Sequence, residues 1–135
     1  MAHRTRNSID AGFTFVELMV VIAIITILVT MAIPIYQRAI TRSKETVLAN
    51  NLFTIRTVID NYTYDKEKAP QNLQDLVSDG YLRTVPTDPI TGRNDTWITV
   101  PETSDQALDP ANPGIFEVHS GSDRIGLDGT PYSQK

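Results

Sequence analysis

Apolar and polar positions divide the chain into four zones. A short polar and basic stretch ends at Gly12, and an apolar run from Phe13 to Gln37 follows, with Glu17 as its only charged residue. Residues 38–64 then alternate between apolar and polar positions, and the chain from about Lys66 onward is rich in Pro, Gly, Asp and Thr. The pattern predicts an apolar helix joined to one small domain, because the chain is too short for two.

The apolar run is long enough to cross a membrane. As a helix, Phe13 to Pro34 would span about 33 Å at a rise of 1.5 Å per residue, and the hydrocarbon core of a bilayer is about 30 Å thick. Arg4 and Arg6 precede the run, so the positive-inside rule keeps the N-terminus in the cytoplasm and exports the C-terminus. A buried helix of a soluble protein is the alternative, but so long an apolar run would exceed the rest of the core.

The stretch after the apolar run is amphipathic. Neither Gly nor Pro interrupts Ile35 to Lys68, so we expect one continuous helix of about 50 residues, with Pro34 as its single internal flaw. Its second half should pack against the head, because apolar side chains recur at three- and four-residue steps. These apolar positions are Val47, Leu48, Leu52, Ile55, Val58, Ile59 and Tyr62.

The remaining chain predicts short elements joined by turns. Pro70 is expected to open a short second helix, which buries Leu73, Leu76 and Val77 and stops at Gly80. Residues 96–100 and 115–118 are expected to form two short strands. The predicted fold class is therefore α+β: a long N-terminal helix, a short second helix, a small antiparallel sheet and a C-terminal loop.

Composition narrows the function. The net charge is −4 and the basic residues are scattered, which is not the footprint of a nucleic-acid-binding protein. The chain has no cysteine, so no disulfide can stabilise a head that is too small to bury much surface. A metal ion or neighbouring subunits would have to supply any further stabilisation.

The N-terminal residues resemble a known export signal. An ordinary signal peptide has a small-residue cleavage site after its apolar run, whereas this chain has a Gly12-Phe13 junction before it. The sequence Gly12-Phe13-Thr14-Phe15-Val16-Glu17 and the run after it resemble the class III signal of type IV pilins and type II secretion pseudopilins. The resemblance implies that a membrane peptidase cuts after Gly12 and methylates the new N-terminus at Phe13. Residues 1–12 would then be a cytoplasmic leader, and residues 13–37 the transmembrane and polymerisation helix.

Glu17 needs a partner inside the membrane. A lone carboxylate there costs roughly 2.5 kcal/mol or more, and cleavage at Gly12 would create an ammonium on Phe13, four residues away. The pair could form within one helix, but the amine of a neighbouring subunit is the better partner in a filament. An interfacial glutamate without a role is the alternative. In the family that the motif resembles, this glutamate serves subunit assembly.

Pro34 frees the carbonyl of Thr30 from its helical hydrogen bond. In related filaments the helix loosens just before this proline, whereas a tolerated kink is the simpler interpretation. Thr26 stands where many relatives have Gly, which puts the loosening in doubt. Thr26 and Thr30 can instead bond back to carbonyls one turn earlier.

The head resembles that of the major pseudopilins. The turn Val85-Pro86-Thr87-Asp88-Pro89 resembles their Pro-x-Asp-Pro turn, and Trp97 follows as an aromatic residue does there. The tail Ser120 to Gly129 resembles their calcium-binding loop, which implies Asp123, Asp128 and Ser122 as ligands, because calcium takes six to eight oxygens. A cluster of Asp-Gly turns without metal is the alternative.

Other candidate residues have simpler explanations. His119, Ser120 and Asp123 do not predict a hydrolase, since no nucleophile motif surrounds Ser120, and no enzyme activity is expected. The aromatic residues Tyr62, Tyr64, Trp97 and Phe116 are predicted to lie in the core. The charges between Arg38 and Asp60 are predicted to form a solvated face that also meets neighbouring subunits.

These observations predict a structural role. We expect residues 38–135 to form a periplasmic head on a single-pass anchor in the bacterial inner membrane. The resemblance implies a homopolymer, the major pseudopilin of a type II secretion system, whose filament stays in the periplasm and drives protein export. Its implied partners are prepilin peptidase, an inner-membrane assembly platform and minor pseudopilins. The alternatives are a subunit of a surface type IV pilus and a membrane-anchored binding domain that does not polymerise.

Overall fold

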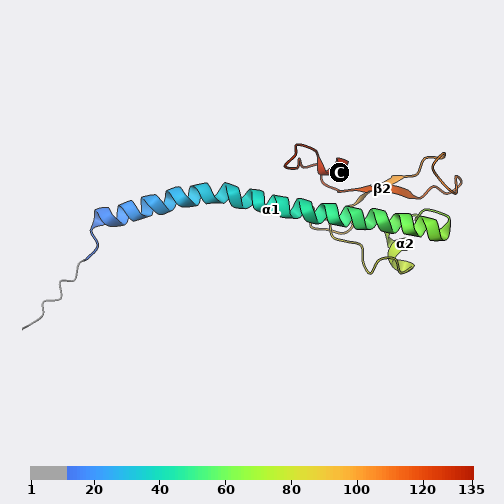
Figure 1. The fold of residues 1–135 in the computed structure, drawn as a ribbon, viewed down its shortest axis with the longest axis horizontal. Helices are drawn as coiled ribbons and strands as arrows, with labels where there is room; N and C mark the ends of the chain where they lie inside the picture. The colour runs from blue at the N-terminus through green and yellow to red at the C-terminus, as the bar shows by residue number, and fades with distance from the viewer. Residues whose placement is uncertain (1–11) are drawn as a thin grey trace, which may run out of the picture. The chain divides into compact units, whose positions relative to one another are not determined.

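A computed structural model describes residues 12–135 of the chain (Figure 1). The elements are α1 (Phe15–Lys66), α2 (Leu73–Ser78), β1 (Ile98–Pro101), β2 (Ile115–His119) and a short 3₁₀ helix, η1 (Tyr132–Gln134). This order confirms the α+β prediction. The chain divides into two compact units, Met1–Arg38 and Ala39–Lys135, and each is described by itself.

The first unit consists of the apolar part of α1. The helix runs without interruption through Pro34 and has 52 residues in all, as the sequence predicts. The large apolar side chains between Phe13 and Tyr36 are exposed, from 43% at Val21 to 81% at Phe13. Among the described residues, α1 is the one helix that is long and apolar enough to cross a membrane, judged by length and composition.

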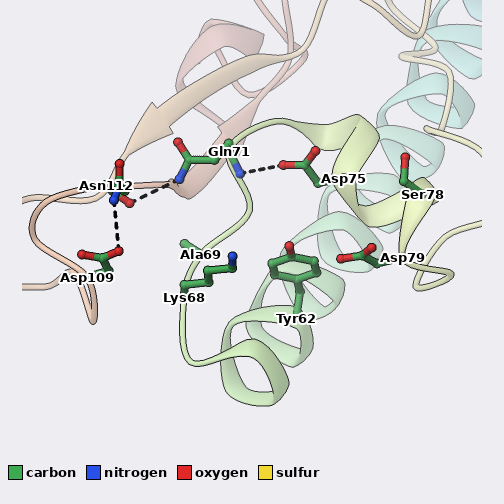
Figure 2. Close-up of a pocket in the computed structure, with 9 residues that line it drawn as sticks. All are labelled: Tyr62, Lys68, Ala69, Gln71, Asp75, Ser78, Asp79, Asp109 and Asn112. Carbon is green, nitrogen blue, oxygen red and sulfur yellow. Dashed lines mark hydrogen bonds between the residues drawn. The ribbon is translucent and has the colours of Figure 1, made fainter.

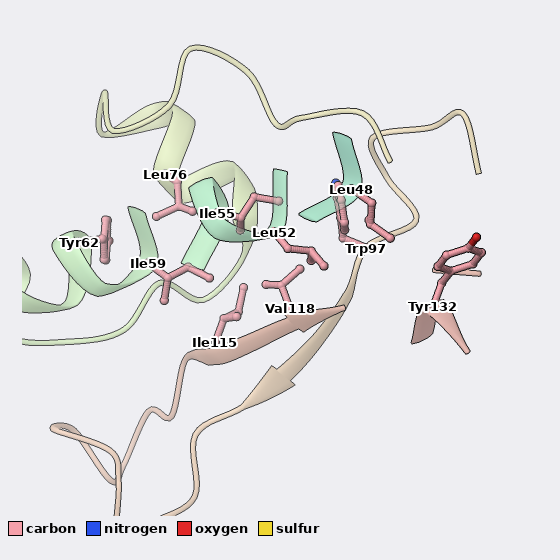
Figure 3. Packing of buried hydrophobic residues seen from close by; sticks show 10 residues of the cluster. All are labelled: Leu48, Leu52, Ile55, Ile59, Tyr62, Leu76, Trp97, Ile115, Val118 and Tyr132. Atoms are coloured by element: carbon pink, nitrogen blue, oxygen red, sulfur yellow. The ribbon is translucent and has the colours of Figure 1, made fainter. Parts of the chain in front are cut away.

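The second unit is the head, and its core lies on one face of α1 (Figure 3). Half of the buried cluster comes from the apolar positions of α1 that the sequence predicts to pack against the head. Val47, another of these predicted positions, is 44% exposed. The other half comes from α2, from the β1–β2 hairpin with Trp97 before it, and from η1. The cluster consists of Leu48, Leu52, Ile55, Ile59, Tyr62, Leu76, Trp97, Ile115, Val118 and Tyr132.

Helix α2 begins later than predicted. Asn72, and not Pro70, precedes its first turn: the Asn72 side chain accepts a hydrogen bond from the Asp75 backbone, and Asp75 accepts one from the Asn72 backbone. This reciprocal capping box satisfies donors that the first turn leaves free. Pro70 is fully buried instead, and its carbonyl accepts a hydrogen bond from Ile115 in β2 at 2.8 Å. Gly80 ends the helix at a φ of 82°, as expected.

Strands β1 and β2 form an antiparallel pair, with Ile98 opposite His119. The register shifts between Val100 and Pro101, whose partners are Glu117 and Ile115. Phe116 is therefore the extra residue of a β-bulge, which turns a side chain out of the regular alternation. Phe116 is 52% exposed and Tyr64 is 85% exposed, so both predictions of a core position were wrong. Trp97, which lies just before β1, is buried as predicted.

Candidate functional site

The Gly12–Phe13 junction precedes the helix and is exposed. Gly12, Phe13 and Thr14 have no helical structure, and α1 begins at Phe15. A side chain at Gly12 would meet nothing within 4 Å. An enzyme could therefore reach this peptide bond without unwinding the helix. Residues 1–11, which include most of the predicted leader, lie outside the described residues.

Thr14 caps the N-terminus of α1. Its hydroxyl oxygen accepts a hydrogen bond from the Glu17 backbone at 3.2 Å, and its carbonyl accepts one from Leu18 at 3.1 Å. Threonine at this position satisfies a backbone donor that the helix leaves free. The cap was missed in the sequence, although Thr-x-x-Glu before an apolar run is the signal for it.

Glu17 lies in the first turn of α1, where the positive end of the helix dipole favours a carboxylate. Among residues 12–135, no side chain forms an ion pair with Glu17. While Gly12 is attached, the nitrogen of Phe13 is an amide and carries no charge. Cleavage would therefore add the cation that the Glu17 carboxylate lacks.

The threonine hydroxyls near Pro34 bond to their own helix. Thr26 donates to the Ile22 carbonyl at 2.8 Å, and Thr30 donates to the Thr26 carbonyl at 2.7 Å. These are the back-bonds expected from the sequence. They leave the two hydroxyls satisfied without a partner outside α1.

The C-terminal segment (Ser120–Lys135) is fastened to α1 by Glu45. One carboxylate oxygen of Glu45 accepts hydrogen bonds from the Leu127 backbone at 2.8 Å and from the Tyr132 hydroxyl at 2.9 Å. Burial and this hydrogen bond raise the pKa of Tyr132. Glu45 therefore joins the helix to residues more than 80 positions away in the sequence.

Arg56 makes a second connection, about three turns further along α1. Its guanidinium pairs with Glu117 of β2 and donates to the backbone oxygens of Val118 at 3.0 Å and Lys135 at 2.6 Å. Glu45 and Arg56 are only partly exposed, so the prediction of a solvated face was wrong for these two. In a chain without cysteine, these polar contacts join the C-terminal segment to α1.

The residues predicted to bind calcium do not form a cluster of ligands. The Asp128 carboxylate lies 3.0 Å from the Lys135 ammonium and accepts a hydrogen bond from Thr130. These two contacts lower the pKa of Asp128, the Thr130 bond first. The Ser122 hydroxyl oxygen accepts a bond from Arg124. In the described part of the chain, no group of three or more acidic, His or Cys residues could hold a metal.

The Lys135 ammonium already supplies a positive charge beside Asp128, and it also lies 4.0 Å from Glu45. A divalent ion at Asp128 would compete with this ammonium. Glu45 is the one further carboxylate that the described contacts of Lys135 place beside it, whereas calcium needs six to eight oxygens. The described arrangement of Asp123, Asp128 and Ser122 therefore does not fit calcium. Calcium binding stays a prediction from the resemblance.

Asp88 connects the turn before β1 to the end of β2. Its side chain has no exposed surface, and its oxygens accept hydrogen bonds from Ile90 at 2.8 Å, Ser120 at 2.6 Å and Gly121 at 3.2 Å. A carboxylate is rarely buried unless it is bonded in this way. The predicted Pro-x-Asp-Pro turn thus has a structural role.

Ser120 and His119 do not form a hydrolytic site. The Ser120 hydroxyl is fully buried and donates to Asp88. His119 is the last residue of β2, one residue beyond the predicted strand, and its buried Nδ1 atom has no hydrogen-bond partner among the described residues. Ser120 therefore has a structural role.

A polar hollow of about 410 Å³ lies between the end of α1, α2 and the loop before β2 (Figure 2). Gln71 bonds to Asp75 and to the carbonyl of Asn112 across its rim, and Asn112 donates to Asp109. Gln71, Asp75, Asp109 and Asn112 are therefore already hydrogen-bonded within the rim of this surface depression.

Comparison with known proteins identifies the family of the chain. Residues 7–33 match the family model of the prokaryotic N-terminal methylation motif. The chain is 30% identical to type II secretion system core protein G of Pseudomonas aeruginosa. The alignment covers 89% of this chain and 85% of that protein. The chain belongs to the type IV pilin and type II secretion pseudopilin family. The pilin family consists of structural subunits rather than enzymes, and this member is a pilin-like filament subunit.

Other pilin-family relatives match over different lengths. Core protein G of Pectobacterium carotovorum is 27% identical over 91% of this chain and 80% of its own length. The type IV major fimbrial protein FimA of Dichelobacter nodosus is 42% identical, but over only 48% of this chain and 41% of its own length. No solved structure shows a significant match. The fimbrial match is thus confined to about half of the chain, whereas the match to core protein G covers most of the helix and the head.

Proposed function

We propose that the chain is the major pseudopilin of a type II secretion system. Prepilin peptidase removes the leader between Gly12 and Phe13, and Phe13 is N-methylated. The apolar part of α1 holds the unassembled subunit in the bacterial inner membrane, with the head in the periplasm. An inner-membrane assembly platform then polymerises the subunits, together with minor pseudopilins, into a periplasmic filament that drives protein export.

The near full-length similarity to core protein G carries this proposal. An alignment that covers 85% of that protein includes the head as well as the helix. A match over half of the chain would not separate the pseudopilins from the pilins, because a fimbrial protein is 42% identical over 48% of this chain. The buried Asp88 supports the same branch, since the turn that holds it resembles the Pro-x-Asp-Pro turn of the major pseudopilins.

Assembly depends in this proposal on Glu17. An ion pair at 4 Å is worth on the order of 4 kcal/mol at an effective dielectric of 20, and much of that only offsets desolvation. The pair of Glu17 with the Phe13 ammonium of a neighbour therefore selects the register of the subunits. The Thr14 cap satisfies the backbone donor of Glu17 within the same subunit and takes no part in the pair between subunits.

The first experiment is the intact mass and N-terminal residue of the protein from its native membrane. We expect an N-terminus at methylated Phe13. An uncut chain, or a cut after the apolar run, would contradict the proposal. An uncut chain that remains monomeric would instead indicate a membrane-anchored binding domain.

A surface type IV pilus is the second candidate, because a fimbrial protein is 42% identical over 48% of this chain. A deletion strain separates the two. Loss of secreted proteins from the medium, with surface filaments unchanged in electron micrographs, supports the pseudopilin. Loss of surface filaments with normal secretion supports the pilus.

A further inference from the structure

The head exposes basic and apolar side chains where its part of α1 begins. Lys44 and Arg124 line one small hollow together with Ile40, and both are exposed. Neither forms an ion pair with another residue of the described range 12–135. Ile125 is 69% exposed and Leu127 is 52% exposed. We call this set the basic end: Ile40, Arg42, Lys44, Arg124, Ile125 and Leu127.

The loop part of the basic end is held at a fixed level along α1. The Leu127 backbone donates to Glu45 at 2.8 Å, and the hollow places Arg124 beside Ile40 and Lys44. The red C-terminal segment can be followed beside the helix in Figure 1. Ile125, between these two anchored positions, therefore stays at the same end of the head.

Chain connectivity brings this end to the membrane surface. Ala39 is the first residue of the head unit. Counted from Gln37, where the apolar run ends, Ile40 lies about 4.5 Å and Lys44 about 10.5 Å further along the helix at 1.5 Å per residue. The headgroup region adds roughly 5–8 Å to each side of the hydrocarbon core. The basic end therefore begins at the height of the headgroups with Ile40. The Lys44 backbone lies just beyond them, and its long side chain leans toward the helix N-terminus and can reach back to them.

We propose that the basic end docks on anionic lipid headgroups before the subunit is assembled. Lys44 and Arg124 meet lipid phosphates, and Ile125 and Leu127 enter the interface. Each basic residue near an anionic surface favours the docked state by about fivefold, and Asp123 opposes them. The inference rests on the proposed membrane anchor and not on filament formation. Docking would hold the head against the bilayer until a neighbouring subunit displaces the lipids.

The test uses the full chain, which contains no native cysteine. An Ile125→Cys variant carries a nitrobenzoxadiazole fluorophore and is reconstituted in vesicles with headgroup-spin-labelled lipid as quencher. We expect strong quenching in vesicles of phosphatidylglycerol and phosphatidylethanolamine, and weak quenching in phosphatidylcholine alone. The Lys44→Glu/Arg124→Glu double variant should lower the docked-to-free ratio at least about 25-fold. Salt should weaken docking as well, because it screens charges.

Two controls locate the effect. The same fluorophore at Ser104→Cys, an exposed loop position before β2, should remain unquenched. A Lys68→Glu/Arg83→Glu variant makes the same charge change at exposed sites outside the basic end and should leave quenching at position 125 unchanged. Fluorescence of Trp97, the single tryptophan, reports that each variant is folded.

Equal quenching in both lipids would overturn the proposal, as would quenching that survives the double reversal in folded protein. Fluorescence changes that depend on protein density in the vesicle would assign the surface to a second copy of the chain, which also overturns it. None of these outcomes concerns leader cleavage or polymerisation. A failed lipid test and a failed pseudopilin assignment are therefore distinguishable.

Discussion

Asp88 is a carboxylate with no solvent exposure, held by donors from two distant parts of the chain. Ile90 belongs to its own turn, whereas Ser120 and Gly121 follow β2. Burying a charge is costly unless its hydrogen bonds are complete. These bonds define how the turn meets the hairpin, and losing the acceptor would leave three donors without a partner.

We expect Asp88→Ala to destabilise the head by about 3 kcal/mol, because buried donors without acceptors cost about 1–3 kcal/mol each. For a domain of this size, that corresponds to roughly 15 °C in Tm. Thermal unfolding of the full chain in detergent, followed by Trp97 fluorescence, measures the change. Asp95→Ala is the control, because Asp95 forms only an exposed pair with Arg93, and its Tm should match the wild type. Equal Tm values for the two variants would refute the role of Asp88.

Asp128 makes stability depend on pH. Its folded pKa lies below the ordinary value of 3.8 because Thr130 and Lys135 favour the charged form. Its contribution is therefore present above that ordinary value and is lost as the pH falls through the folded pKa. Wild type should have a higher Tm than Asp128→Asn at neutral pH, and the two should converge in acid. A Tm difference that persists in strong acid would contradict this.

Lys135 bears on the predicted calcium site. Its ammonium lies between Asp128 and Glu45, so we expect a chelator to leave the Tm of the wild-type chain unchanged. In Lys135→Met, which removes the ammonium, the same measurement tests whether the freed carboxylates bind calcium. A wild-type Tm that rises with added calcium would show that Asp123 and Asp128 rearrange around the ion.

At the scale of elements, local pattern predicts some positions and not others. The long helix and its buried stripe follow from apolar spacing over many turns, which tertiary contacts rarely override. Tyr64 occupies a helix position two residues beyond the buried Tyr62, which turns it away from the core. Phe116 is exposed because of a bulge, and a bulge depends on the partner strand. Pro70 and Asn72 were both plausible starts of α2, and the reciprocal bonds with Asp75 decided for Asn72.

The candidate site divides in the same way. The cleavage motif, Glu17 and Pro34 all lie within residues 12–34, so one stretch of sequence is enough to predict them. The comparisons confirm the family of this motif. Glu45, Arg56 and Asp88 act through partners 32 or more residues away. No spacing rule reveals such partners, and their roles became visible only in the folded head.

Glu45 should control access to the C-terminal segment. In Glu45→Ala the Leu127 backbone and the Tyr132 hydroxyl lose their acceptor, so the segment should open more often. Limited trypsin digestion should then cut after the exposed Arg124 several-fold faster than in wild type, as measured by fragment mass. Asp60→Ala removes one negative charge from the same helix and serves as the control. Equal cleavage rates in Glu45→Ala and Asp60→Ala would disprove the fastening.

At the scale of the whole molecule, Glu17 and Thr14 separate assembly from helix capping. Glu17→Gln removes the charge but keeps the size, and we expect processed subunits that do not enter filaments. Thr14→Ala removes only the cap, at a cost of about 1 kcal/mol, and should still assemble. Sedimentation of filaments from cells, with N-terminal sequencing of the unassembled pool, measures both. If Thr14→Ala fails to the same extent, the role of Glu17 lies in the helix and not in a pair between subunits.

The contacts of the C-terminal segment also set an order of events in time. Tyr132 closes the core cluster and bonds to Glu45, and the backbone oxygen of Lys135 meets Arg56 from 79 positions away. Contacts of such long sequence separation form late and slowly. If the chain is exported N-terminal helix first, the head cannot complete its fold until the last residues have crossed the membrane. A subunit whose translocation has stalled would thus present an open head, and cellular proteases could remove it before it is offered to a growing filament.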